Sequence, residues 1–280
     1  MSDKSRRVFI SIDMEGISGI VDGSQTGGDT GEYQTGRRLM VGDLNAAVEG
    51  ALAAGVEEVI VSDAHGGMRN LQPEEVHEAA YLIRGSPKPW SMMEGIGKDY
   101  EAALYVGYHA MKGTQNGVLA HTISGGTVDA IWINGRETGE FGLNAALAGW
   151  HGVPSVFISG DAAVAAEARA FVPKIGSAVV KWAVGRQAAT CLHPKKAQAL
   201  IRKTAAEALA KAGSIEPFRV AEPVEFRLRL VNSLGGDAAG GLPYAERLDG
   251  RTIRAVFDDY PTAIRGLSAA ISIAGSAMRR

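Results

Sequence analysis

Residues 8–13, VFISID, show the sequence pattern that recurs through the first half of the chain. They form a short apolar run that ends on a carboxylate, and residues 59–62, VIVS, repeat this design just before Asp63. Between the two runs, the apolar side chains of residues 37–54 recur at helical spacing, and Gly55 is expected to end that helix. Strand, helix and strand in this order are typical of βαβ units, which build a parallel sheet.

The same alternation continues to about residue 185. Further strands are predicted at residues 103–107, 128–133 and 153–158, and a helix is predicted at residues 141–149. Asn134-Gly135 is the strongest hairpin signal in the chain, with residues 136–138 as the return strand. We therefore expect an α/β architecture in which helices flank a mostly parallel sheet.

The last third of the sequence has a different pattern of apolar and polar residues. Its predicted elements are a helix from Pro194 to near Gly213, strands at residues 224–230 and 253–257, and a closing helix from about Thr262. Residues 224–230 alternate strictly between apolar and polar side chains, so we expect one face of that strand to be exposed to solvent, as in antiparallel or edge strands. We expect an α/β domain over residues 1–190 and a smaller C-terminal α+β domain over residues 191–280, with a soft boundary.

The composition excludes several classes of partner. The 280 residues include 29 Lys+Arg and 31 Asp+Glu, a net charge of −2, so we expect no binding to nucleic acid or to an anionic membrane. Residues 1–7 are polar and residues 266–278 are too short to span a bilayer, so neither an export signal nor a membrane span is expected. The single Cys191 fits a reducing compartment, and we expect a cytoplasmic location.

Polar side chains gather where the predicted parallel strands end. Asp13 and Glu15 are two residues apart on an extended segment, so their carboxylates point to the same side. His65 and His109 each follow a predicted buried strand, and ligands of parallel sheets bind at those ends. Two imidazoles with two carboxylates form the mixed ligand set of a hydrolytic zinc centre, and carboxylates able to bridge favour two metals.

Each of these residues also has a plainer interpretation. Asp13 could cap a turn and Glu15 could be solvated in a loop, while His65 and His109 could be hydrogen-bonded loop residues. A phosphotransfer site would need a second aspartate where Glu15 stands, which weakens that alternative.

Two further residues fit a metal-dependent site. Glu140 heads a predicted helix, where the helix dipole alone would favour a carboxylate. His121 falls in an alternating run over residues 118–123, where its imidazole could simply be buried and hydrogen-bonded. The three remaining histidines are expected to have structural or surface roles: His77 in an acidic exposed helix, His151 at a helix end, and His193 before Pro194.

Four segments carry a resemblance to a known family: residues 11–19 (SIDMEGISG), 63–65 (DAH), 104–110 (LYVGYHA) and 139–145 (GEFGLNA). In order and spacing they closely resemble the zinc-dependent D-aminopeptidases associated with bacterial dipeptide transport operons. A weaker likeness runs through residues 89–95 and 159–161. The departures are extra N-terminal residues, an insertion-like stretch at residues 27–30 and a divergent C-terminal part, which bear on substrate range more than on chemistry.

The resemblance implies a site and an assembly. It implies two Zn²⁺ per subunit, bound by Asp13, Glu15, His65, His109 and Glu140, with His121 as the catalytic residue, either nucleophile or acid–base. It also implies a two-domain subunit, with the metal-binding catalytic site in the α/β part. Subunits of the family form a self-compartmentalising ring, so a homo-oligomer of five or ten copies is expected.

The activity implied by the resemblance is removal of an N-terminal D-amino acid, such as D-alanine, from short peptides and amides. Metals held by carboxylates would activate water and polarise the scissile carbonyl, so that no serine or cysteine nucleophile is needed. Two alternatives stay open. One is another metal-dependent hydrolase, acting on L-peptides, amides or phosphoesters; the other is a non-catalytic dipeptide-binding component of a transport system, which would normally carry an export signal.

Overall fold

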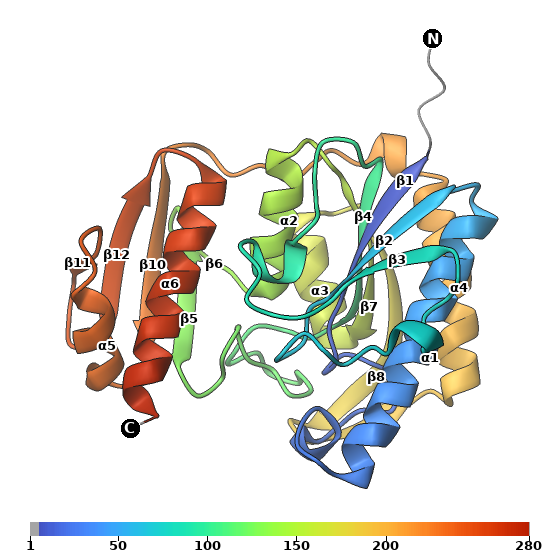
Figure 1. The fold of residues 1–280 in the computed structure, drawn as a ribbon, viewed down its shortest axis with the longest axis horizontal. Helices are drawn as coiled ribbons and strands as arrows, with labels where there is room; N and C mark the ends of the chain where they lie inside the picture. Colours follow the sequence, from blue (N-terminus) through green and yellow to red (C-terminus); the bar gives the residue numbers. More distant parts are fainter. Residues whose placement is uncertain (1–5, 280) are drawn as a thin grey trace.

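Strand β1 (Arg7–Ile12) is an interior strand of a seven-stranded sheet, sheet A (Figure 1). The computed structural model describes residues 6–279; residues 1–5, which begin the polar opening segment, and residue 280 lie outside the described part. In spatial order the strands of sheet A are β3 (Ala80–Ile83), β2 (Glu58–Asp63), β1, β4 (Ala102–Tyr108), β7 (Ser155–Asp161), β8 (Gly176–Gly185) and β9 (Ala188–Cys191). Neighbours from β3 to β8 pair parallel, and β9 runs antiparallel at the edge.

Helices cover both faces of sheet A (Figure 1). On one face α1 (Gly31–Ala53) packs against α4 (Pro194–Leu209), and the other face carries α2 (Glu140–Trp150) and α3 (Ala162–Phe171). Every residue of β4 is buried, as expected for a central strand between two helical layers. The expected α/β architecture with a mostly parallel, helix-flanked sheet is confirmed.

A second, antiparallel sheet, sheet B, stands beside sheet A (Figure 1). Its strands, in spatial order, are β11 (Glu246–Arg247), β12 (Thr252–Phe257), β10 (Val224–Leu230), β5 (Val128–Ile133) and β6 (Arg136–Glu137). Helices α5 (Ser233–Gly240) and α6 (Tyr260–Met278) pack on sheet B, and the Tyr260 hydroxyl donates to the Leu143 carbonyl in α2 at 2.9 Å. No helix within residues 6–279 combines the length and the apolar character needed to cross a bilayer.

The division between the two sheets does not coincide with the boundary expected near residue 190. β5 and β6 come from the first part of the chain but belong to sheet B, where β5 pairs with β10. Helix α4 follows residue 190 but packs on α1 beside sheet A. The local sequence pattern of a strand or helix does not specify which distant element it contacts. The division into domains at residues 1–190 and 191–280 stays a prediction.

The hairpin signal is confirmed, and the first helix begins earlier than predicted. Asn134 and Gly135 have φ values of 47° and 80°, the left-handed pair that a two-residue turn between β5 and β6 requires. Helix α1 begins at Gly31, before the predicted start at residue 37, because the Thr30 side chain accepts the Tyr33 N–H and caps the first turn.

One alternating run is not a strand, and one local prediction is wrong. Residues 118–123 alternate in sequence but form a loop, in which Leu119 and Ile123 have φ values of 52° and 59°, left-handed conformations that a strand does not adopt. His77 lies outside any helix, because the chain makes only the short 3-10 turn η2 (Pro73–Glu75) before it enters the edge strand β3, which the sequence reading missed. The other 3-10 turns are η1 (Gly23–Gln25), η3 (Ser91–Met93) and η4 (Ala212–Ser214).

Candidate metal centre

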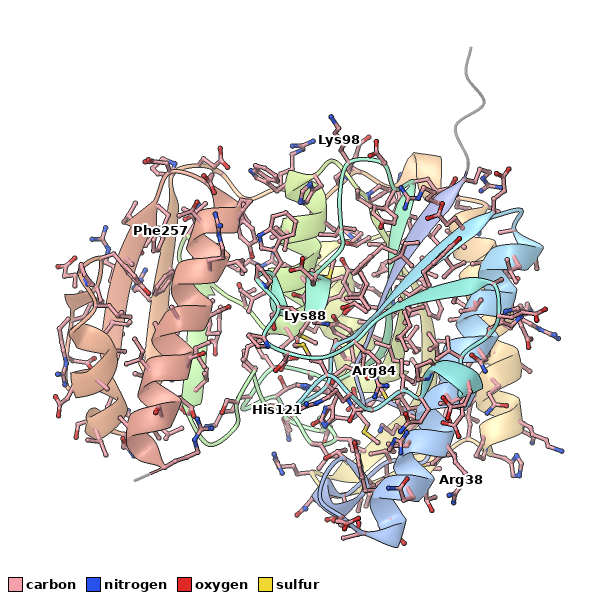
Figure 2. All side chains as sticks on the ribbon, viewed as in Figure 1. Arg38, Arg84, Lys88, Lys98, His121 and Phe257 are labelled. Atoms are coloured by element: carbon pink, nitrogen blue, oxygen red, sulfur yellow. The ribbon has the colours of Figure 1, made fainter. Side chains whose placement is uncertain are left out.

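The carboxyl ends of β1, β2 and β4 meet at one edge of sheet A. Asp13 and His109 come directly after β1 and β4, and His65 comes two residues after β2. Glu140 is the first residue of α2, and Glu15 and His121 come from loops. Figure 2 shows His121 in the middle of the molecule, between α6 and the strands of sheet A. The structure thus brings all six sequence-predicted site residues together.

The six side chains form two clusters, one of Asp13, Glu15 and His65 and one of His109, His121 and Glu140. In the first cluster, His65 Nδ1 lies 3.1 Å from Asp13 Oδ1 and 3.0 Å from Glu15 Oε2. In the second cluster, His109 Nε2 lies 3.3 Å from Glu140 Oε1 and 3.3 Å from Asp13 Oδ2. Asp13 therefore presents one oxygen to each cluster, as a carboxylate that bridges two cations would.

Backbone carbonyls fix the orientation of all three imidazoles. His65 Nε2 donates to the Thr26 carbonyl at 2.8 Å, which turns Nδ1 toward the carboxylates. His109 and His121 donate through Nδ1 to the carbonyls of Ala110 (3.0 Å) and Leu119 (2.9 Å), so their Nε2 atoms face the clusters. A ring nitrogen held by a carbonyl while the other is free is the usual arrangement around metal-ligating histidines.

Several buried polar atoms of the clusters have no hydrogen-bond partner among the described residues. They are Asp13 Oδ2, Glu15 Oε2 and His109 Nε2. Unpaired buried polar atoms are costly, and cations coordinated by these atoms would satisfy all of them. Imidazole nitrogens and carboxylate oxygens are ligands that zinc accepts, so the residues present fit the metal that the sequence predicts.

The electrostatics of the clusters favour positive charge. Burial pushes the pKa of Glu15 upward, but His65, His109 and His121 outweigh burial and the net pKa is lowered. For Glu140, too, the neighbouring imidazoles outweigh burial and lower the pKa. Burial disfavours the imidazolium forms of His65 and His109, yet the carboxylates raise the pKa of both rings well above the usual value. The same negative field that draws protons here would draw divalent cations, which displace those protons on binding.

His121 lies slightly apart from the other five side chains. Its Nε2 is 3.8 Å from Glu140 Oε1 and 4.0 Å from Glu15 Oε1, and its ring stacks on that of His109 at 4.1 Å. The loop that carries it is anchored by Val118 N–H, which donates to Asp161 Oδ2 at 2.6 Å. His121 is therefore within reach of both clusters without the close contacts of His65 and His109.

The loop that carries Glu15 is held close to the end of β4. Gly16 N–H donates to the Gly107 carbonyl at 2.8 Å, and a Cβ at Gly16 would overlap the Tyr108 carbonyl oxygen. The next turn of the loop is fixed by Asp43, which accepts both the N–H and the hydroxyl of Ser18 at 2.8 Å. Burial raises the pKa of Asp43 to about 6 although both bonds favour its charged form.

A buried lysine completes this support. Lys181 on β8 is fully buried, and its ammonium donates to the carbonyls of Glu15 (2.5 Å), Ile17 (3.0 Å) and Ile20 (2.6 Å). Burial lowers the pKa of Lys181 to about 8 against the opposing effect of nearby acidic groups. Sequence reasoning missed this residue, although a lysine within the otherwise apolar run at residues 178–183 was a usable signal.

Two connected cavities open at the clusters. The first, about 190 Å³, is lined by Asp13, His65, His121 and Glu140 together with Met92 and Ile123 among others. The second, about 250 Å³, extends to α6 and shares Gly66, Met68, Ser91, Met92 and Ile123 with the first. An open groove of about 710 Å³ reaches the other side of His121. A small molecule could therefore approach both clusters at once.

The remaining histidines take no part in the clusters. His77 Nδ1 accepts the Ala79 N–H, His193 caps the start of α4, and His151 follows the end of α2 beside Trp90 and Trp150.

Comparison with known proteins gives consistent matches along the chain. A family model described as D-aminopeptidase matches residues 6–269. A D-aminopeptidase of Bacillus subtilis (strain 168) is 36% identical over 246 residues, which are 88% of this chain and 89% of that protein. The solved structure of the Zn-dependent D-aminopeptidase DppA from Bacillus subtilis, described as a self-compartmentalizing protease, superposes with a TM-score of 0.93 at 33% identity and covers 96% of this chain and 98% of that one.

Replacing Lys181 tests the support of the Glu15 loop. Lys181→Met should leave the carbonyls of Glu15, Ile17 and Ile20 buried and unpaired, which we expect to lower the free energy of unfolding by about 3 kcal/mol. The affinity for zinc, measured by competition with a chelator, should fall as well because Glu15 loses its fixed position. Lys203→Met, on the exposed face of α4, is the matched control and should change neither quantity. Wild-type stability in Lys181→Met would contradict this account.

Proposed function

This chain belongs to the D-aminopeptidase family, and we propose that it removes the N-terminal D-amino acid, such as D-alanine, from short peptides and amides at a dinuclear zinc centre. The observation that carries the proposal is the pair of ligand clusters, in which one oxygen of Asp13 lies near His65 and the other near His109. Five ligand-type side chains exceed what one four-coordinate zinc with an open position needs. The assigned ligands are Asp13, Glu15, His65, His109 and Glu140.

In the proposed mechanism the metal ions and the side chain of His121 have different roles. These five residues would hold zinc, which when bound would supply the Lewis acidity that polarises a peptide carbonyl and lowers the pKa of water. His121 acts on the substrate, as acid–base or as nucleophile, through Nε2, because its Nδ1–H is held by the Leu119 carbonyl. The slightly longer distances from His121 to the carboxylates support a catalytic role over a ligand role.

An assembly and a location belong to the same proposal. DppA is described as self-compartmentalizing, and we propose that this chain also forms a ring-shaped homo-oligomer of five or ten copies. Exposed apolar side chains at Tyr81, Trp182 and Val184 support contacts between copies. A cytoplasmic location is supported by Cys191, which has no second cysteine in the chain to pair with. A monomeric mass by light scattering would contradict the ring.

Metal content separates ligands from the catalytic residue. The purified protein should hold two zinc ions per chain and lose peptidase activity on chelation. His65→Ala and His109→Ala should lose zinc and activity together, whereas His121→Ala should lose activity and keep most of its zinc. His77→Ala, which lies outside both clusters, is the control and should keep both. Loss of zinc from His121→Ala to the same extent as from His65→Ala would make His121 a ligand.

Stereochemistry tests the substrate class. With the carbonyl fixed at the metals, inverting Cα moves the side chain to another wall of the cavity, and about 1 Å of misplacement costs on the order of 100-fold in rate. We expect kcat/KM for D-alanyl-D-alanine to exceed that for L-alanyl-L-alanine by at least about that factor. A phosphomonoester assayed in parallel should give no turnover. Equal rates for both enantiomers, or release of phosphate, would favour one of the other metal-dependent hydrolases, and no turnover with zinc bound would favour a binding protein.

A further inference from the structure

Asn144 lies beside the metal centre without belonging to either cluster. It follows Glu140 by four residues on α2, so the two side chains lie one turn apart on the same face of the helix. Asn144 is only 8% exposed, and it lines the cavity of about 250 Å³ that adjoins the clusters.

A chain of hydrogen bonds fixes the orientation of the Asn144 carboxamide. The Ser11 hydroxyl donates its one hydrogen to the Met92 carbonyl at 3.0 Å, so the Tyr108 hydroxyl must donate to Ser11 Oγ at 2.7 Å. The Tyr108 oxygen is then free to accept from Asn144 Nδ2 at 2.8 Å, and the same Nδ2 lies 3.2 Å from Met92 Sδ. The amide nitrogen therefore faces inward.

This arrangement leaves the Asn144 carbonyl oxygen without a donor among the described residues. The other side chains with polar atoms that line the cavity are serines, which can donate as well as accept, and Lys88 and Trp90, which can only donate. Lys88, labelled in Figure 2, directs its ammonium to Ser62 Oγ at 2.8 Å and to the Asp63 carbonyl at 2.7 Å. Asn144 Oδ1 is thus the strongest acceptor among the side chains of the wall that cannot also donate, and an N–H group of a ligand would supply the donor that it lacks among the described residues.

The rest of the cavity wall is mostly apolar. Its apolar side chains come from loops at the carboxyl ends of the strands of sheet A, such as Met68 and Met92, and from α2 and α6, such as Leu143 and Leu267. A ligand that suits this cavity carries an apolar group for the wall and an N–H donor for Asn144.

We propose that Asn144 Oδ1 accepts a hydrogen bond from the free α-amine of the substrate while the apolar side chain of the N-terminal residue occupies this cavity. The inference rests on the proposed function, in which the scissile carbonyl lies at the clusters. The amine nitrogen is only two bonds from that carbonyl carbon, and Asn144 follows Glu140 by about 6 Å along α2, so the amine acceptor and the clusters are separated by about the length of one amino-acid residue.

The chemistry of a carboxamide suits this position. Its oxygen accepts from an amine in either protonation state, so binding does not require an ammonium beside metal cations. An aspartate in place of Asn144 would add a fourth carboxylate near Glu140, where it could compete for the metals. An asparagine therefore recognises the amine without disturbing the ligand set.

Binding of paired metal-chelating ligands isolates the amine. D-leucine hydroxamate and its des-amino analogue, 4-methylpentanohydroxamate, share the chelating group and the side chain and differ only at the amine. Their Kd values for the zinc-loaded protein are measured by calorimetry, independently of turnover. Wild type should prefer the amine-bearing compound, and Asn144→Ala should reduce that preference about 10- to 100-fold with its zinc content unchanged. Asn45→Ala, a helical asparagine on α1 outside both cavities, should preserve the preference.

A second variant keeps the inference testable if Asn144→Ala does not fold. Tyr108→Phe removes the acceptor that holds Asn144 Nδ2, so the carboxamide can turn and the same preference should fall by a smaller factor. An unchanged preference, or equal weakening of both hydroxamates, overturns the inference. A wild type that shows the Asn144-dependent preference but does not hydrolyse D-peptides overturns the proposed function and leaves the amine site standing.

Discussion

The two oxygens of Asp13 face two different histidines, and the strand order of sheet A makes this possible. β1 lies between β2 and β4, so His65 arrives on one side of Asp13 and His109 on the other. A strand order that placed β1 at an edge would bring only one imidazole to this carboxylate. The parallel direction of the three strands is equally necessary, because it gathers their carboxyl ends at one edge.

Burying so many ionisable groups is costly, and the surrounding structure shows how the cost is offset. Three backbone carbonyls each hold one imidazole in a single orientation. Lys181 ties down the loop behind Glu15, and Gly16 allows that loop to touch the end of β4. Within the clusters, three polar atoms remain unpaired among the described residues, and cations would coordinate them: Asp13 Oδ2, Glu15 Oε2 and His109 Nε2.

The sequence predicts the elements that depend on local pattern. The apolar runs predict the strands. The residues that follow these runs predict the site, because Asp13, His65 and His109 come at or near the strand ends in the sequence. The partner of β5 and the packing of α4 depend on contacts between distant segments, which local pattern does not encode. The conformation around His121 depends on a distant contact in the same way, because Asp161 anchors that loop. The sequence does not show that Asn144 Oδ1 lacks a donor, because this depends on the hydrogen bonds that the Asn144 side chain makes in the folded structure.

The proposed function depends on a dinuclear centre in which one oxygen of Asp13 would face each metal ion. X-ray absorption at the zinc edge of the purified protein tests it most directly. The account predicts nitrogen and oxygen ligands at about 2.0–2.2 Å, no sulfur ligand at about 2.3 Å, and a zinc–zinc separation of about 3.5–4 Å. A spectrum with a single isolated zinc, or with sulfur from Cys191 in its ligand shell, would contradict it.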